Sequence, residues 1–95
     1  MRDYEMMIIL NPSIDERNMG EYVERLLQVV PNEGGTLKNV DMWGKRRLAY
    51  EINKCSEGVY VVVDMATTPE TAKELDRQLS LNEAVLRTKL MRKDA

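Results

Sequence analysis

The sequence predicts an α+β fold in which a four-stranded antiparallel sheet carries two helices on one face. Four segments rich in apolar and β-branched residues are separated by two segments whose apolar residues recur at helical spacing. Their order is β-α-β-β-α-β within 95 residues, which is the split βαβ or ferredoxin-like plan. This length suits a single domain spanning residues 1–95.

The first strand is predicted at residues 4–10, which form a nearly unbroken apolar run. Such a run is typical of a central strand that is buried on both faces. Asn11-Pro12 should end the strand. Ser13 and Glu16 have the spacing of a capping box, so we expect the first helix to open there.

The first helix is predicted from an apolar stripe that extends over four turns. Its members are Met19, Tyr22, Val23, Leu26, Leu27 and Val30. We expect Pro31 and Gly34-Gly35 to end this helix, since proline and glycine rarely continue one.

Two further strands should follow as a pair. Residues 36–53 alternate as an extended segment, with an irregularity expected at Trp43-Gly44. Residues 54–58 have the composition of a turn. Val59–Met65 contains three consecutive valines and is strongly predicted to be a strand.

The second helix should open at Thr68-Pro69, because proline suits the first helical position. A narrow apolar stripe follows, formed by Ala72, Leu75 and Leu79. Asn82 should end the helix, and Val85–Met91 is predicted to be the last strand.

Alternation along the last strand predicts which side chains face the helices. One face takes Leu86, Thr88 and Leu90, of which the two leucines suit the helix-covered side. Arg87 and Lys89, together with Val85 and Met91, should then lie on the open side of the sheet. A cationic sheet face contributes little to folding, so this arrangement indicates a binding surface.

The composition favours a globular protein without a membrane segment. Apolar residues are 43% of the chain and charged residues 32%. The longest apolar runs, Met6–Leu10 and Val59–Val63, are far shorter than the roughly 20 residues that cross a bilayer. The start of the chain does not have the pattern of a signal peptide. Cys55 is the only cysteine, so we expect no intramolecular disulfide and a cytoplasmic protein.

No catalytic or metal-binding pattern is present in the sequence. The chain lacks histidine, the commonest general base and metal ligand, and a cysteine without histidine is a poor nucleophile. Acylphosphatases of this fold need a glycine-rich phosphate loop after the first strand, where this chain has Asn11-Pro12-Ser13. The sequence also lacks any residue pattern that would indicate the polar-lined cavity of ferredoxin-like oxygenases. We therefore expect no enzyme activity, cofactor, metal or small-molecule substrate.

Charge is unevenly distributed, although the net charge is only −2. Acidic residues gather at positions 15–24, and basic residues at Lys45-Arg46-Arg47 and positions 87–93. The basic triplet lies beside Trp43 and close to Tyr50. Basic side chains bind phosphates and aromatic faces accept unstacked bases, so this segment is a candidate RNA contact. The competing interpretation is a solvated strand face in which Trp43 caps the core.

Several segments resemble the bacterial small-subunit ribosomal protein S-six family. They are Met1-Arg2-x-Tyr4-Glu5 with Ile8-x-Leu10, the decapeptide from Trp43 to Ile52, Glu57-Gly58-x-Tyr60, Leu75 to Leu79, and Val85-Leu86-Arg87. The resemblance covers residues 1 to about 93. The decapeptide is its specific part, and the Trp-Gly-Lys-Arg-Arg form is similar to actinobacterial members.

The resemblance implies a non-catalytic building block of the small ribosomal subunit. It implies binding to the central domain of the small-subunit ribosomal RNA as a heterodimer with ribosomal protein S-eighteen. In the family this partner is basic, which would account for the modest charge of the chain.

The residues expected to meet RNA or the partner combine the family motif with the basic segments. They are Arg2, Tyr4, Trp43, Lys45, Arg46, Arg47, Arg87, Lys89 and Arg92. Tyr60 and Val62, on the predicted open sheet face, are expected at the partner interface. A generic RNA-recognition module is an alternative, but Glu57 stands where its motif needs a basic residue.

Overall fold

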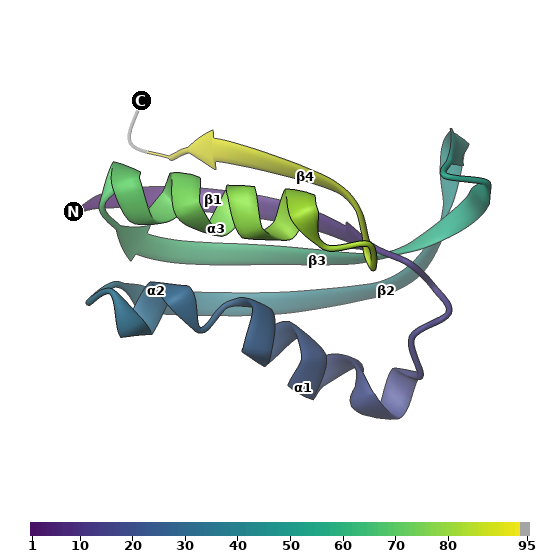
Figure 1. The fold of residues 1–95 in the computed structure, drawn as a ribbon, viewed down its shortest axis with the longest axis horizontal. Coiled ribbons are helices and arrows are strands. Elements are labelled where there is room, and N and C mark those ends of the chain that lie inside the picture. Colours follow the sequence, from purple (N-terminus) through teal and green to yellow (C-terminus); the bar gives the residue numbers. More distant parts are fainter. Residues whose placement is uncertain (94–95) are drawn as a thin grey trace.

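The computed structural model describes residues 1–93 and confirms the predicted α+β architecture. Its strands are β1 (Arg2–Leu10), β2 (Thr36–Ile52), β3 (Cys55–Thr67) and β4 (Val85–Arg92). Its helices are α1 (Glu16–Leu26), α2 (Val29–Asn32) and α3 (Pro69–Leu81). The strands form one sheet in the order β2-β3-β1-β4, and all neighbouring strands are antiparallel. In Figure 1, α3 runs along β1 and β4, whereas α1 runs along the β2 side.

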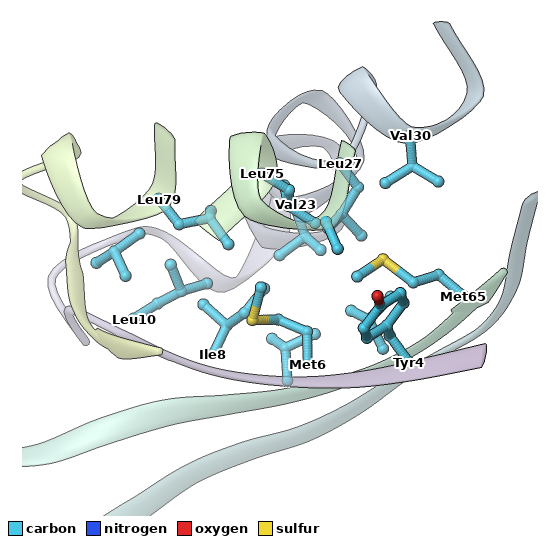
Figure 2. Packing of buried hydrophobic residues seen from close by; sticks show 14 of the residues in the cluster. Tyr4, Met6, Ile8, Leu10, Val23, Leu27, Val30, Met65, Leu75 and Leu79 are labelled. Carbon is cyan, nitrogen blue, oxygen red and sulfur yellow. The ribbon is translucent and has the colours of Figure 1, made fainter. Parts of the chain in front are cut away.

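The core lies between the sheet and the helices. Alternate residues of β1, from Tyr4 through Met6 and Ile8 to Leu10, point toward the helix layer (Figure 2). The helices bury the predicted stripes against them, at Met19, Val23, Leu27, Val30, Ala72, Leu75 and Leu79. Ile9 is buried as well, although it points to the other face. This end of β1 is therefore covered on both sides, as expected of a central strand.

The helix α1 begins later than the predicted capping box. Its N-cap is Asp15, whose carboxylate accepts a hydrogen bond from the Arg17 backbone N–H at 3.0 Å. The Ser13 N–H instead donates to Asn11 Oδ1 at 2.9 Å, which forms a turn directly after β1. The predicted cap at Ser13 is therefore wrong. The side chain of Glu16 lies outside the part of the chain that the structure describes.

The apolar stripe from Met19 to Val30 packs on the core as predicted, with Tyr22 and Leu26 only partly buried, but the first helix ends within it and a second short helix follows. The helix α1 ends at Leu26, and Pro31 lies inside α2 instead of terminating the first helix. A proline is tolerated there because the first turn of a helix leaves its N–H groups without partners. Gly34 then ends α2 with a φ of +86°, a conformation that favours glycine.

The hairpin joining β2 to β3 turns on two residues. Ile52 pairs with Cys55, and Asn53 and Lys54 have φ values of 49° and 66°. Two positive φ values are typical of a type I′ turn, whose twist matches that of the flanking strands. The predicted turn at residues 54–58 is therefore placed too late, since β3 already begins at Cys55. The hairpin extends past the rest of the sheet and bends away from the direction of the other strands (Figure 1).

Register shifts in the pairing of β2 and of β4 reset which face the side chains occupy. The β2–β3 register shifts between Met42 and Gly44, which has a φ of +87°, so the irregularity predicted at Trp43-Gly44 is confirmed. The β1–β4 register shifts as well, because Leu10 pairs with Val85 while Ile9 pairs with Arg87.

The shift in β4 corrects one predicted orientation. Val85 is only 8% exposed and belongs to the core, so its assignment to the open face is wrong. Beyond the shift, Arg87 and Lys89 pair with Ile9 and Met7 of β1 on the open face, as predicted. Thr88 lies on the helix side, where its hydroxyl donates to Asp76 Oδ1 of α3 at 2.7 Å.

The helix α3 has the predicted ends. Thr68 is the N-cap and accepts a hydrogen bond from the Thr71 N–H at 3.2 Å, with Pro69 in the first helical position. Asn82 is the C-cap, and its side-chain oxygen accepts from the Ala84 N–H at 2.9 Å. These local signals define the helix and the entry into β4.

Candidate nucleic-acid and partner interface

Five residues form an aromatic and cationic group on the face of the sheet away from the helices. We call them the open-face cluster: Trp43, Arg46, Tyr50, Tyr60 and Arg87. Trp43, Arg46 and Tyr50 come from β2, Tyr60 from β3 and Arg87 from β4. The sheet and the bent hairpin therefore bring a segment that the sequence already singled out together with two residues from other strands.

The first half of the cluster is built around Trp43. Its ring is stacked on Tyr60, with centroids 6.4 Å apart and planes 9° from parallel. The Arg46 guanidinium lies 5.4 Å from the Trp43 ring centroid, within cation–π range. The indole Nε1–H donates to Asp41 Oδ2 at 3.0 Å, which fixes the ring orientation. Trp43 remains 43% exposed, so it does not cap the core.

The second half joins the hairpin to β4. The Arg87 guanidinium lies 5.4 Å from the Tyr50 ring centroid and donates a hydrogen bond to the Tyr50 hydroxyl. The strands β2 and β4 are at opposite edges of the sheet, so Tyr50 reaches Arg87 across the open face. Between the two halves lies a groove of about 220 Å³, lined by Met7, Ile9, Tyr60, Arg87, Thr88 and Lys89.

A glycine allows the hairpin to pack this closely. A Cβ placed on Gly58 would lie 2.4 Å from Ile9 Cγ2, which is shorter than any ordinary contact. Leu48 also packs over this position and is only 8% exposed. Gly58 is thus explained by packing within the chain rather than by the RNA-recognition motif that Gly58-Val59-Tyr60 faintly resembles.

The basic triplet is not one patch. Lys45 pairs with Val59, Arg46 with Gly58 and Arg47 with Glu57 along the β2–β3 ladder. Because side chains alternate along a strand, Lys45 and Arg47 point to the face opposite Arg46. Only Arg46 joins the open-face cluster.

The two residues predicted at the partner interface both lie on the open face. Tyr60 pairs with Ile9, and Val62 pairs with Met7 on one side and Asp41 on the other. Both side chains are half-buried. They lie two positions apart on the inner strand β3; we call these two residues the apolar band, which shares Tyr60 with the open-face cluster.

Three other predicted residues lie on the helix side of the sheet. Tyr4 is 5% exposed and packs in the core, with its hydroxyl directed toward the helix layer (Figure 2). Arg2 and Arg92 are exposed at the same end of the sheet, where Tyr4 pairs with Arg92. Lys73 of α3 lines a pocket with these three residues and was not predicted, since only the tertiary packing brings it there.

The far end of the open face is electrostatically neutralised. Lys38 Nζ lies 2.7 Å from Asp3 Oδ1, and Lys93 Nζ lies 3.2 Å from Asp64 Oδ1. The hydrogen bond from Lys38, followed by its positive charge, holds the pKa of the Asp3 carboxyl below its ordinary value of 3.8. Because of these two ion pairs, the strand ends differ in charge from the cationic part of the open face.

Within residues 1–93, no three histidine, cysteine, aspartate or glutamate side chains are grouped in a way that could hold a metal ion. The same part of the chain has no helix whose length and apolar character would let it span a bilayer.

The fold matches solved structures over nearly the whole chain. The 30S ribosomal protein S6 from Thermotoga maritima superposes with a TM-score of 0.89 at 29% identity, covering 98% of this chain and 88% of that one. The C-terminal domain of the MgtC protein from Mycobacterium tuberculosis shares the fold, with a TM-score of 0.66 at 14% identity. That second match covers 97% of this chain and 87% of the other and concerns the fold alone.

Sequence comparison identifies the family. A small ribosomal subunit protein bS6 from Beutenbergia cavernae is 62% identical over 95 residues, covering all of this chain and 99% of the relative. The protein of the same name from Mycobacterium tuberculosis is 60% identical over 94 residues, covering 99% of this chain and 98% of the relative. These actinobacterial relatives confirm the resemblance drawn from the decapeptide. The family model described as Ribosomal protein S6 matches residues 3–92, and the chain therefore belongs to this family of non-enzymatic ribosomal proteins.

Proposed function

We propose that this chain is a structural constituent of the small ribosomal subunit in the cytoplasm. In this role it binds the central domain of the small-subunit ribosomal RNA as a heterodimer with ribosomal protein S-eighteen. Membership in the Ribosomal protein S6 family supports the ribosomal role. The open-face cluster is the observation that carries the binding proposal, because an exposed group of stacked aromatic and arginine side chains suits recognition.

The protein partner is assigned to the open face. Tyr60 and Val62 form an apolar band there, and Trp43 and Tyr50 beside it are 43% and 58% exposed. Tyrosine, tryptophan and arginine are enriched at the centres of protein interfaces, because they bury large areas and retain a polar group. Covering this face would remove from water apolar surface that the free chain leaves exposed.

The RNA contacts are assigned to exposed cations near the proposed protein interface on the open face. Lys45 and Arg47 point away from the open face, and Arg46 and Lys89 lie on it. Such side chains bind phosphates and set register without reading base sequence. Since the net charge of this chain is −2, a basic partner would supply much of the phosphate neutralisation.

The proposal is tested by titrating a central-domain fragment of ribosomal RNA in a gel-shift assay, with this chain alone, S-eighteen alone and both together. We expect tight binding only with both proteins. For four to six phosphate contacts, the logarithm of affinity should fall against that of salt with a slope of roughly −3 to −5. A folded chain that does not increase RNA binding under either condition would refute the proposal.

A further inference from the structure

A second basic concavity lies on the helix-covered side of the sheet. It has a volume of about 370 Å³ and opens where α3 begins, beside the ends of β1 and β4. Its lining consists of Arg2, Tyr4, Pro69, Ala72, Lys73, Leu90 and Arg92. We call it the edge pocket. Among residues 1–93, the charged residues that line it are the three cations Arg2, Lys73 and Arg92, although the whole chain is slightly acidic.

Strand register explains why these cations meet. Tyr4 pairs with Arg92 between β1 and β4, so both side chains point to the helix side. Arg2 lies two positions before Tyr4 on β1 and shares that face. Lys73 comes from α3, one helical turn after Pro69. Three elements thus bring three positive side chains to one hollow.

A hollow lined by side chains of one charge attracts ions of the opposite charge. The acidic side chain of the first turn of α3 is Glu70, and it does not line the pocket. The walls between the cations are apolar, formed by Tyr4, Ala72 and Leu90. Apolar walls with cations beside them suit a sugar–phosphate unit, whose ribose packs on the walls while its phosphate binds the cations.

We propose that the edge pocket binds a phosphate of the RNA backbone, with Lys73 as one of its ligands. This inference rests on the proposed function and assigns its RNA and protein contacts to different surfaces. The edge pocket adds an RNA contact on the helix side to those of the hairpin cations, while the aromatic residues of the open-face cluster receive the protein partner. The two surfaces lie on opposite faces of the sheet, so both can be occupied at once.

The test is the variant Lys73→Gln in the full chain, titrated with S-eighteen and the central-domain RNA fragment at several salt concentrations. Lys73 is exposed, so its neutralisation should leave the fold intact. We expect RNA affinity to fall about threefold to tenfold at 0.1 M salt. The salt slope should become shallower by about 0.7 to 0.9, as for the loss of one phosphate contact. Heterodimer formation without RNA should be unchanged.

Arg25→Gln is the matched control, since it removes one exposed positive charge from α1, away from the edge pocket. It should retain the wild-type salt slope. If Lys73→Gln also keeps the wild-type slope and affinity, the edge pocket is not an RNA site, although wild-type binding would leave the proposed function standing. Weaker heterodimer formation without RNA would assign the pocket to the protein partner and overturn the inference. Failure of the wild-type pair to bind RNA would instead remove the proposed function on which the inference rests.

Discussion

Single residues decide how closely the bent hairpin lies on the sheet. Gly58 accepts the Ile9 side chain where any Cβ would collide with it, and Leu48 packs against the same place. This contact lets the β2–β3 hairpin, which carries Arg46 and Tyr50, lie close against Ile9 of β1. The position of the open-face cluster thus depends on a residue that takes no part in it.

The substitution Gly58→Ala should destabilise the protein by roughly 1–3 kcal/mol, because the added methyl group overpacks against Ile9. Gly20→Ala is the matched control. A Cβ at Gly20 meets nothing within 4 Å, and alanine favours a helix, so this variant should be more stable by about 0.5–1 kcal/mol. Urea denaturation measures both. Equal effects of the two substitutions would show that the hairpin does not press on β1 as described.

A single carboxylate should also give the stability of the fold a pH dependence. The pKa of Asp3 is held below 3.8 in the folded protein, chiefly by the hydrogen bond from Lys38. The unfolded chain therefore binds the proton more readily, and the stabilisation is present above the unfolded pKa and lost as pH falls through the folded pKa. Thermal denaturation between pH 6 and pH 3 should show a smaller loss of stability for Asp3→Asn than for the wild type. An identical acid profile would contradict this account of the Asp3–Lys38 pair.

At the scale of elements, the β2–β3 hairpin is the main functional unit. Its register shift after Met42 places Arg46 on the same open face as Trp43, and strand alternation separates Arg46 from Lys45 and Arg47. The two-residue turn at Asn53-Lys54 closes the hairpin beyond the sheet. One hairpin can therefore present cations on both faces of the sheet, on the open face proposed to receive the protein partner and on the opposite face.

Reversing charge on both faces of the hairpin should weaken RNA assembly. The double variant Arg46→Glu with Arg47→Glu changes two exposed side chains, so it should cost less than about 1 kcal/mol of folding stability. Loss of two phosphate contacts should lower RNA affinity of the heterodimer at least tenfold. Arg17→Glu with Arg25→Glu makes the same charge change on α1 and should have a much smaller effect. Comparable RNA binding by the hairpin variant and the wild type would exclude the hairpin as an RNA contact.

At the scale of the whole molecule, the sheet separates two candidate surfaces. Its helix-covered face has the edge pocket at one end, and its open face has the apolar band and the open-face cluster. The ion pairs of Asp3 and Asp64 neutralise the strand ends that lie between these two surfaces. This division lets one small domain meet protein and RNA at the same time.

A charge in the apolar band should break the partner contact. Val62→Asp places a carboxylate beside Asp41 on the open face and should weaken heterodimer formation at least about tenfold, or 1.4 kcal/mol. The milder variant Val62→Thr keeps the shape of the side chain and should lose far less affinity. Isothermal titration with S-eighteen measures both, and circular dichroism verifies the fold. An undiminished affinity of folded Val62→Asp would place the partner elsewhere.

The sequence predicts those parts of this molecule that depend on local chemistry. Thr68, Pro69 and Asn82 mark the ends of α3 because capping is decided within a few residues. The register shifts in β2 and β4 involve pairing between distant strands, so alternation alone misplaced Val85. For the same reason the run Lys45–Arg47 looked like one patch, and Lys73 could not be linked with Arg2 and Arg92.

Binding at the open-face cluster can be followed directly at Trp43. This is the only tryptophan of the chain, so 5-fluorotryptophan labelling gives a single ¹⁹F resonance that reports on the cluster. We expect this resonance to shift on addition of S-eighteen and to become less accessible to a soluble paramagnetic quencher. A resonance that stays unshifted and equally accessible, while gel shift demonstrates the complex with partner and RNA, would contradict it.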